Sequence, residues 1–202
     1  MILENPLAWV CVGVAVSLPL KAFLKSRALF RERSMDDVFP FLRPLDPEKL
    51  QKLFDPEEER LRPFRMSDYR YRREQRVRLD LAREYLHRMI HNAEIVQQWA
   101  GTEFIDCADF PGEYDEATMQ LICEQAAMFR IAAHVVLAKI WLFGLLQNLE
   151  ALHLAPIPKI APLRRTGSVN LLEIYAHLKD SAALLAFKNY GQEFCDEMNS
   201  RM

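Results

Sequence analysis

Residues 7–20 form an uncharged apolar run, LAWVCVGVAVSLPL, and Glu4 is the only ionisable side chain between Met1 and this run. A helix that crosses a bilayer needs about 20 mainly apolar residues. The run is slightly short, but Lys21 and Lys25 can lengthen it because their long side chains reach back to the interface. The sequence therefore predicts a membrane-anchor helix whose hydrocarbon-facing residues include Trp9, Val12, Val14, Val16, Leu18 and Leu20.

The charges that flank this run predict its orientation. Lys21, Lys25, Arg27, Arg31 and Arg33 all follow the run, and basic residues favour the cytoplasmic side of a membrane. The amino terminus is therefore predicted outside and the rest of the chain in the cytoplasm. A cleaved signal peptide would carry its basic segment before the run, so secretion is rejected. A helix buried in a partner, lying in the interface or packed in the domain core remains an alternative for residues 1–30.

Residues 34–64 contain five prolines and no glycine, so no long helix can form there. Asp46-Pro47-Glu48 and Asp55-Pro56-Glu57 are typical helix starts and predict short helices near 47–54 and 56–62. Phe39, Phe41 and Leu42 are too apolar for a solvated linker. We call residues 34–64 the strap and consider two roles for it: covering its own domain, or docking those three side chains into a partner's groove.

Three long helices are predicted after the strap. Apolar residues recur at helical spacing over 68–100, and Gly101 and the acidic stretch 103–115 are read as a stop and a loop. A second helix spans 115–154, and its middle, 131–146, is apolar nearly all round, which predicts a central core helix. A third begins at Asn170, with Glu173 completing a capping box, and ends at Gly191.

Only 6 of the 202 residues are glycine, and no alternating apolar run of useful length occurs. The predicted fold is therefore all-α: an N-terminal membrane-anchor helix, a proline-punctuated strap of short helices and a three-long-helix bundle. The corresponding domains are 1–33, 34–64 and 65–202. Residues 126–146 are long enough for a second span, but Arg130, His134 and Lys139 inside them favour a bundle helix.

Arginine is concentrated where the first long helix begins. Eight arginines and only two acidic residues lie between Arg60 and Arg78, a net charge of +6, with Phe64, Tyr69 and Tyr71 among them. Arginine with aromatic residues suits single-stranded nucleic acid, but it also suits an anionic leaflet. Because the anchor holds this segment near the inner leaflet, the predicted partners are anionic lipid or a protein of a membrane complex, with nucleic acid unlikely. The residues assigned to this contact are Arg70, Arg72, Arg73 and Arg76.

A metal site is the second possibility. Glu84-x-x-His87 on the first long helix recurs as Glu150-x-x-His153 on the second, and such pairs occur in di-metal carboxylate bundles. Those bundles need four helices where three are predicted, and His87 falls on the polar face. No phosphate loop, nucleophile elbow or H-E-x-x-H motif occurs, and no cofactor is expected.

The function predicted from the sequence is therefore that of a membrane-tethered helical interaction or scaffold protein, an accessory subunit of a membrane assembly rather than an enzyme. The alternatives are a metal-dependent helical-bundle enzyme and an arginine-rich nucleic-acid binder. The net charge of -2 over the whole chain argues against a dedicated nucleic-acid packaging protein.

Overall fold

The structure, a computed structural model, describes residues 38–55, 67–109, 116–151 and 170–202, and every regular element in these ranges is helical. The predicted anchor and the predicted short helix 56–62 lie outside the described residues. The elements are η2 (Phe39–Phe41), α2 (Pro47–Phe54), α4 (Asp68–Asp109), α5 (Glu116–Ala151), α6 (Leu171–Tyr190) and α7 (Gln192–Arg201). The all-α prediction and the three long helices are thereby confirmed.

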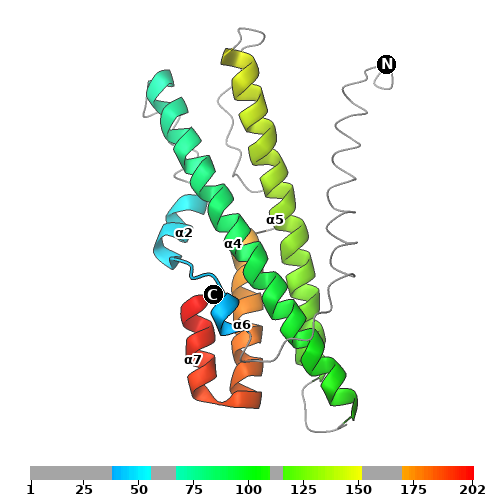
Figure 1. Ribbon diagram of the computed structural model, residues 1–202. Coiled ribbons are helices and arrows are strands. Elements are labelled where there is room, and N and C mark those ends of the chain that lie inside the picture. Colours follow the sequence, from blue (N-terminus) through cyan, green and yellow to red (C-terminus); the bar gives the residue numbers. More distant parts are fainter. Residues whose placement is uncertain (1–37, 56–66, 110–115, 152–169) are drawn as a thin grey trace, which may run out of the picture.

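The two longest helices, α4 and α5, run side by side as an antiparallel pair (Figure 1). Helix α6 packs on α5, and α7 folds back against α6. Figure 1 shows α6 and α7 beside only one half of this pair, so the amino-terminal half of α4 and the carboxyl-terminal half of α5 project beyond them. Helix α2 packs against α4, and its buried Leu53 belongs to the same hydrophobic core as the rest.

The sequence predicted that α4 ends at Gly101, but the helix continues to Asp109. Glycine inside a helix costs about 1 kcal/mol relative to alanine, so tertiary contacts must outweigh that cost. Trp99 is fully buried, and its indole Nε1 donates to Glu103 Oε1 at 2.8 Å. The Tyr190 hydroxyl at the end of α6 donates to the same carboxylate oxygen. The residues read as the start of an acidic loop therefore hold α4 against α6.

Gly191 ends α6 as predicted, but the chain beyond it forms a further helix, α7, that the sequence analysis missed. Gly191 has a φ of 95°, which a residue with a side chain rarely adopts, and this turn reverses the chain. Asn170 is the N-cap residue of α6, but its side chain makes no capping hydrogen bond, so the predicted capping box is not formed.

The described part of the strap packs on its own domain. Phe39 and Leu42 are only 7% and 4% exposed and belong to the core, whereas Phe41 is half exposed. The fully buried Asn92 of α4 accepts a hydrogen bond from the Arg43 N–H and donates one to the Arg43 carbonyl, both at 2.8 Å. Phe39 and Leu42, two of the three side chains considered for docking into a partner, thus lie in the core of their own domain, which is the other role considered for the strap.

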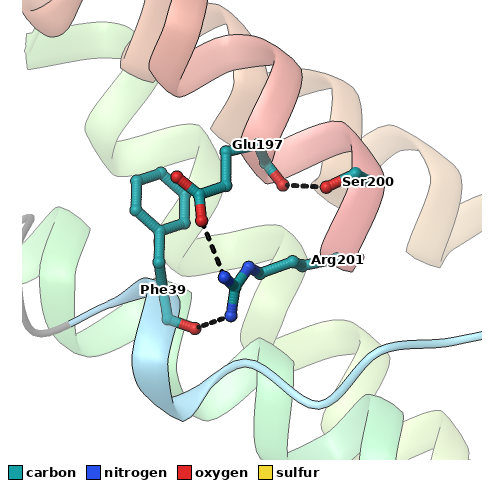
Figure 2. A network of polar contacts seen from close by, with 4 residues as sticks. All are labelled: Phe39, Glu197, Ser200 and Arg201. Atoms are coloured by element: carbon teal, nitrogen blue, oxygen red, sulfur yellow. Dashed lines mark hydrogen bonds and ion pairs between the residues drawn. The ribbon is translucent and has the colours of Figure 1, made fainter.

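The C-terminal helix fixes the strap from the other side. Arg201 donates from Nη1 to the Phe39 carbonyl oxygen and from Nη2 to Glu197 Oε1, and both distances are 2.8 Å (Figure 2). The Phe39 ring also packs on Phe194 of α7, with ring centroids 5.7 Å apart. The described part of the strap therefore lies between α4 and α7 and joins distant parts of the chain.

Helix α5 carries apolar side chains on two opposite faces. Its inner face, including Ile122, Phe129 and Ile140, is buried, whereas its outer face exposes large apolar residues. The predicted central core helix is thus covered on one side only by the described residues. By length and composition α5 could cross a membrane over residues 116–147, and only 28% of its most apolar window is buried.

Candidate functional site

A basic groove lies between α2 and the first turns of α4. Its volume is about 850 Å³, and its described lining holds five cationic residues and one acidic residue, Glu74. The cations are Lys49, Lys52, Arg70, Arg73 and Arg78, and the apolar residues are Leu53, Tyr69, Val77 and Leu81. We call these ten residues the basic groove. Cations on both walls with an aromatic ring at the edge can take a phosphate or carboxylate group.

The short helix α2 forms because its first turn is well capped. Asp46 accepts a hydrogen bond from the Lys49 N–H at 3.1 Å, and Pro47 occupies the first turn, where its missing N–H is not needed. The Lys49 ammonium also lies 2.9 Å from the Asp46 carboxylate. The hydrogen bond from Lys49 lowers the pKa of Asp46, and the same contact raises the pKa of Lys49, so both groups stay charged near neutral pH.

Arg78 holds α2 against α4. Its side chain is 6% exposed, and its Nε donates to the Leu53 carbonyl in the last turn of α2 at 3.1 Å, with Nη2 donating to the same oxygen. A guanidinium group at the carboxyl end of a helix satisfies a carbonyl that lacks an intrahelical partner and complements the helix dipole. Arg78 therefore positions the two walls of the groove.

The four arginines predicted to form one contact surface lie on different faces of α4. At about 100° per residue, Arg70 and Arg73 are about 60° apart, whereas Arg70 and Arg72 are about 160° apart. Arg70 and Arg73 line the basic groove, and Arg70 Nε pairs with Glu74 Oε1 at 2.9 Å. Arg76 instead lines a separate groove of about 390 Å³ between α4 and α5. Arg72 is exposed and lines neither of these two grooves.

Two cations of the basic groove, Lys49 and Lys52, were missed by the sequence analysis because they precede Arg70, the first of the assigned arginines, by about twenty residues. Their spacing of three residues places them on one face of α2, which was a readable signal. Within the described part of the chain, neither Lys52 nor Arg73 has a carboxylate partner. These two side chains are therefore available to an anionic ligand.

The residues proposed for a metal are only partly within the described chain. Glu84 is exposed and pairs with Arg88, and His87 is also exposed. The side chain of Glu150 and the whole of His153 lie outside the described residues, so the four-residue site is not tested. In the ranges that the structure describes, no three His, Cys, Asp or Glu side chains come together as a metal site would need.

Comparisons with known proteins add no further constraint. No known protein family, no curated protein and no solved structure matches this chain. The basic groove and the exposed faces of the helices are therefore the features from which a function can be inferred.

Proposed function

We propose that this chain is a membrane-tethered helical interaction protein whose basic groove binds the phosphate headgroups of anionic lipids at the inner leaflet. The observation that carries the proposal is the groove itself, in which two helices contribute cations around aliphatic side chains, with the Tyr69 ring at the edge. Each basic residue near an anionic membrane contributes about 1 kcal/mol to binding. Tyr69, which is 79% exposed, is suited to the headgroup level, where aromatic rings gather.

The tether is the apolar segment 7–20, with the basic residues after it on the cytoplasmic side. A chain held in this way needs only weak headgroup contacts, because the anchor keeps the groove close to the bilayer. The long apolar helix α5 is consistent with a protein that works at a membrane. An acidic protein of the same membrane assembly offers carboxylates to the same groove and is the competing ligand.

The tether is tested by washing native membranes with alkaline carbonate. A chain with a spanning anchor stays in the pellet, and release into the supernatant would contradict the tether while leaving the groove untested.

The groove is tested with the full chain reconstituted in vesicles and labelled with a fluorophore at Tyr69→Cys, in a background where the native cysteines are serine. Energy transfer to a headgroup-labelled lipid is expected to be strong with phosphatidylserine present and weak in pure phosphatidylcholine. Arg73→Glu changes the groove, whereas Arg72→Glu makes the same charge change outside it. Only Arg73→Glu is expected to weaken headgroup contact, by about fivefold to thirtyfold. Equal effects of the two variants would contradict the groove proposal.

A further inference from the structure

The outer face of α5 presents an exposed apolar stripe. We define the α5 stripe as seven residues that are each 42–61% exposed, namely Leu121, Met128, Ile131, Val135, Trp141, Leu142 and Leu145. Ile131 lies about 200° around the helix from the buried Phe129, so the stripe faces away from the core. Isolated exposed apolar residues need no explanation, but a contiguous row of this length indicates an interaction surface.

The spacing of the stripe is that of a helix–helix seam. Met128, Ile131, Val135, Leu142 and Leu145, together with the half-buried Ala138, follow each other at alternating steps of three and four residues. Steps of three and four are the a and d positions of a heptad repeat, which pack against a matching helix. Two charged residues lie within this segment. Arg130 is 7% exposed and turns to Gln97 of α4 at 2.8 Å, and Lys139 is partly buried and takes an e position beside the seam, where charged residues are common in paired helices.

We infer that the α5 stripe binds the α5 stripe of a second copy of this chain, with the two helices antiparallel. The two ends of the stripe are complementary in charge. Glu116 and Glu124 are exposed at its beginning, whereas Arg76 and Arg83 line the groove beside Trp141 and Leu145 at its end, with one acid, Asp80. A twofold axis near residue 133 places Glu124 of each copy opposite Leu142 of the other, one helical turn from Leu145 and the groove it lines. In that groove Arg83 pairs with Asp80 at 3.4 Å, so Arg76 is the cation that Glu124 would meet.

The area of the stripe also suits a second copy. Seven half-exposed side chains of about 200 Å² each offer on the order of 700 Å² per copy, close to the roughly 800 Å² that each partner gives in a stable interface. An anionic lipid surface is a poorer match, because Glu116 and Glu124 would lie at it unpaired. The inference uses the described helices alone and does not depend on the anchor or on the basic groove.

The first test is the mass of the full chain, purified in a mild non-ionic detergent, by light scattering at micromolar concentration. A dimer is expected. Val135→Glu places an unpaired charge in the seam and is expected to weaken association by at least about thirtyfold. Leu184→Glu, on α6, is the matched control because Leu184 and Val135 are both 46% exposed. Circular dichroism of both variants shows whether the fold is kept.

The second test fixes the direction of pairing by disulfide formation in native membranes. Met128→Cys and Ala138→Cys, each in a chain whose native cysteines are serine, are expected to crosslink when co-expressed. Neither is expected to crosslink with itself, because ten residues separate the sites by about 15 Å along the helix. Self-crosslinking at residue 128 would overturn the antiparallel pair. A monomeric chain would overturn the inference altogether, whether residues 7–30 or lipid then covers the stripe.

Discussion

Asn92 and Arg43 exchange two hydrogen bonds of 2.8 Å, so the side-chain amide of one residue takes both backbone groups of the other. Asn92 is fully buried, and its Nδ2 also donates to the Tyr175 hydroxyl at 3.3 Å. This one amide therefore connects the strap, α4 and α6. Burial raises the pKa of Tyr175, which keeps its hydroxyl neutral in this contact.

Replacing that amide is expected to destabilise the whole fold. Asn92→Ala removes both part-buried hydrogen bonds to the Arg43 backbone and empties part of a fully buried position. A buried polar group left without a partner costs about 1–3 kcal/mol, and the cavity adds to this loss. The free energy of unfolding should fall by about 2–4 kcal/mol in urea titrations. Asn199→Ala, at an exposed position on α7, is the control and should change it by less than about 0.5 kcal/mol. Similar losses in both variants would argue against the special role of Asn92.

The contact between Arg201 and the Phe39 carbonyl should control local opening of the strap. Arg201→Ala removes this hydrogen bond and the pair with Glu197, and the loss of stability is expected near 1 kcal/mol. Because Leu42 N–H donates to the Val38 carbonyl within the same turn, the protection of this amide from hydrogen exchange should fall. Arg201→Lys keeps the charge but cannot make both contacts, so its stability and its amide protection should lie between those of the unchanged chain and those of Arg201→Ala. Unchanged exchange at Leu42 in Arg201→Ala would refute the expectation.

Glu103 should matter more than an ordinary glutamate. Its carboxylate is 8% exposed and accepts hydrogen bonds from Trp99 and Tyr190, which join the end of α4 to the end of α6. Glu103→Ala leaves the buried indole N–H unpaired and should lower the free energy of unfolding by about 2–3 kcal/mol. Glu193→Ala, at an exposed position in α7, provides the comparison. The result to look for is a difference between the two variants, measured by thermal or urea unfolding.

The cap of α2 should make one wall of the basic groove sensitive to acid. The pKa of Asp46 is lowered in the folded chain, so its carboxylate stabilises α2 above the unfolded value of about 3.9. That contribution is lost as the pH falls through the lower folded value. Protection factors of the α2 amides should therefore decrease in acid, below about pH 4. Asp46→Asn keeps a capping acceptor without a titrating group, and its α2 should lose this pH dependence.

Salt should weaken binding in the basic groove but not pairing through the α5 stripe. Binding of headgroups in the basic groove relies on exposed charges such as Lys52 and Arg73, and the Debye length shortens from about 10 Å at 0.1 M to about 3 Å at 1 M salt. Energy transfer from a label at position 69 to anionic lipid should therefore decline across this range. Pairing through the α5 stripe is apolar and should persist. Headgroup contact that ignores salt would count against the groove.

The sequence predicted helix bounds correctly where local signals alone determine them. The Asp46-Pro47-Glu48 start predicted α2 within its observed bounds, and the apolar spacing predicted the starts of α4 and α5 to within a residue or two. It failed at Gly101, where contacts of Trp99 and Glu103 with Tyr190 outweigh the local stop, because Tyr190 lies 87 residues beyond Glu103 in the chain. Helix α7 was missed because it is only ten residues long and directly follows the stop signal at Gly191.

Only part of the candidate site could be predicted from the sequence, because contacts between residues distant in the chain also shape it. The arginine-rich segment was visible, but its division between two sides of α4 follows from where α2 and α5 pack. Lys49 and Lys52 joined the site only because Arg78 holds the last turn of α2 against α4. The apolar side chains of α5 were read as core because sequence alone does not show that α4 and α6 cover a single face.

The hydrogen bond between Arg201 and Phe39 joins positions 162 residues apart, which sets an order for biosynthesis. A ribosome that adds about 5–20 residues per second needs roughly 10–30 s to extend the chain from Phe39 to Arg201. During that interval α7, which covers the apolar side chains around Phe39, has not yet been made. Until α7 has been made, a nascent chain of this kind exposes apolar surface that is prone to aggregation.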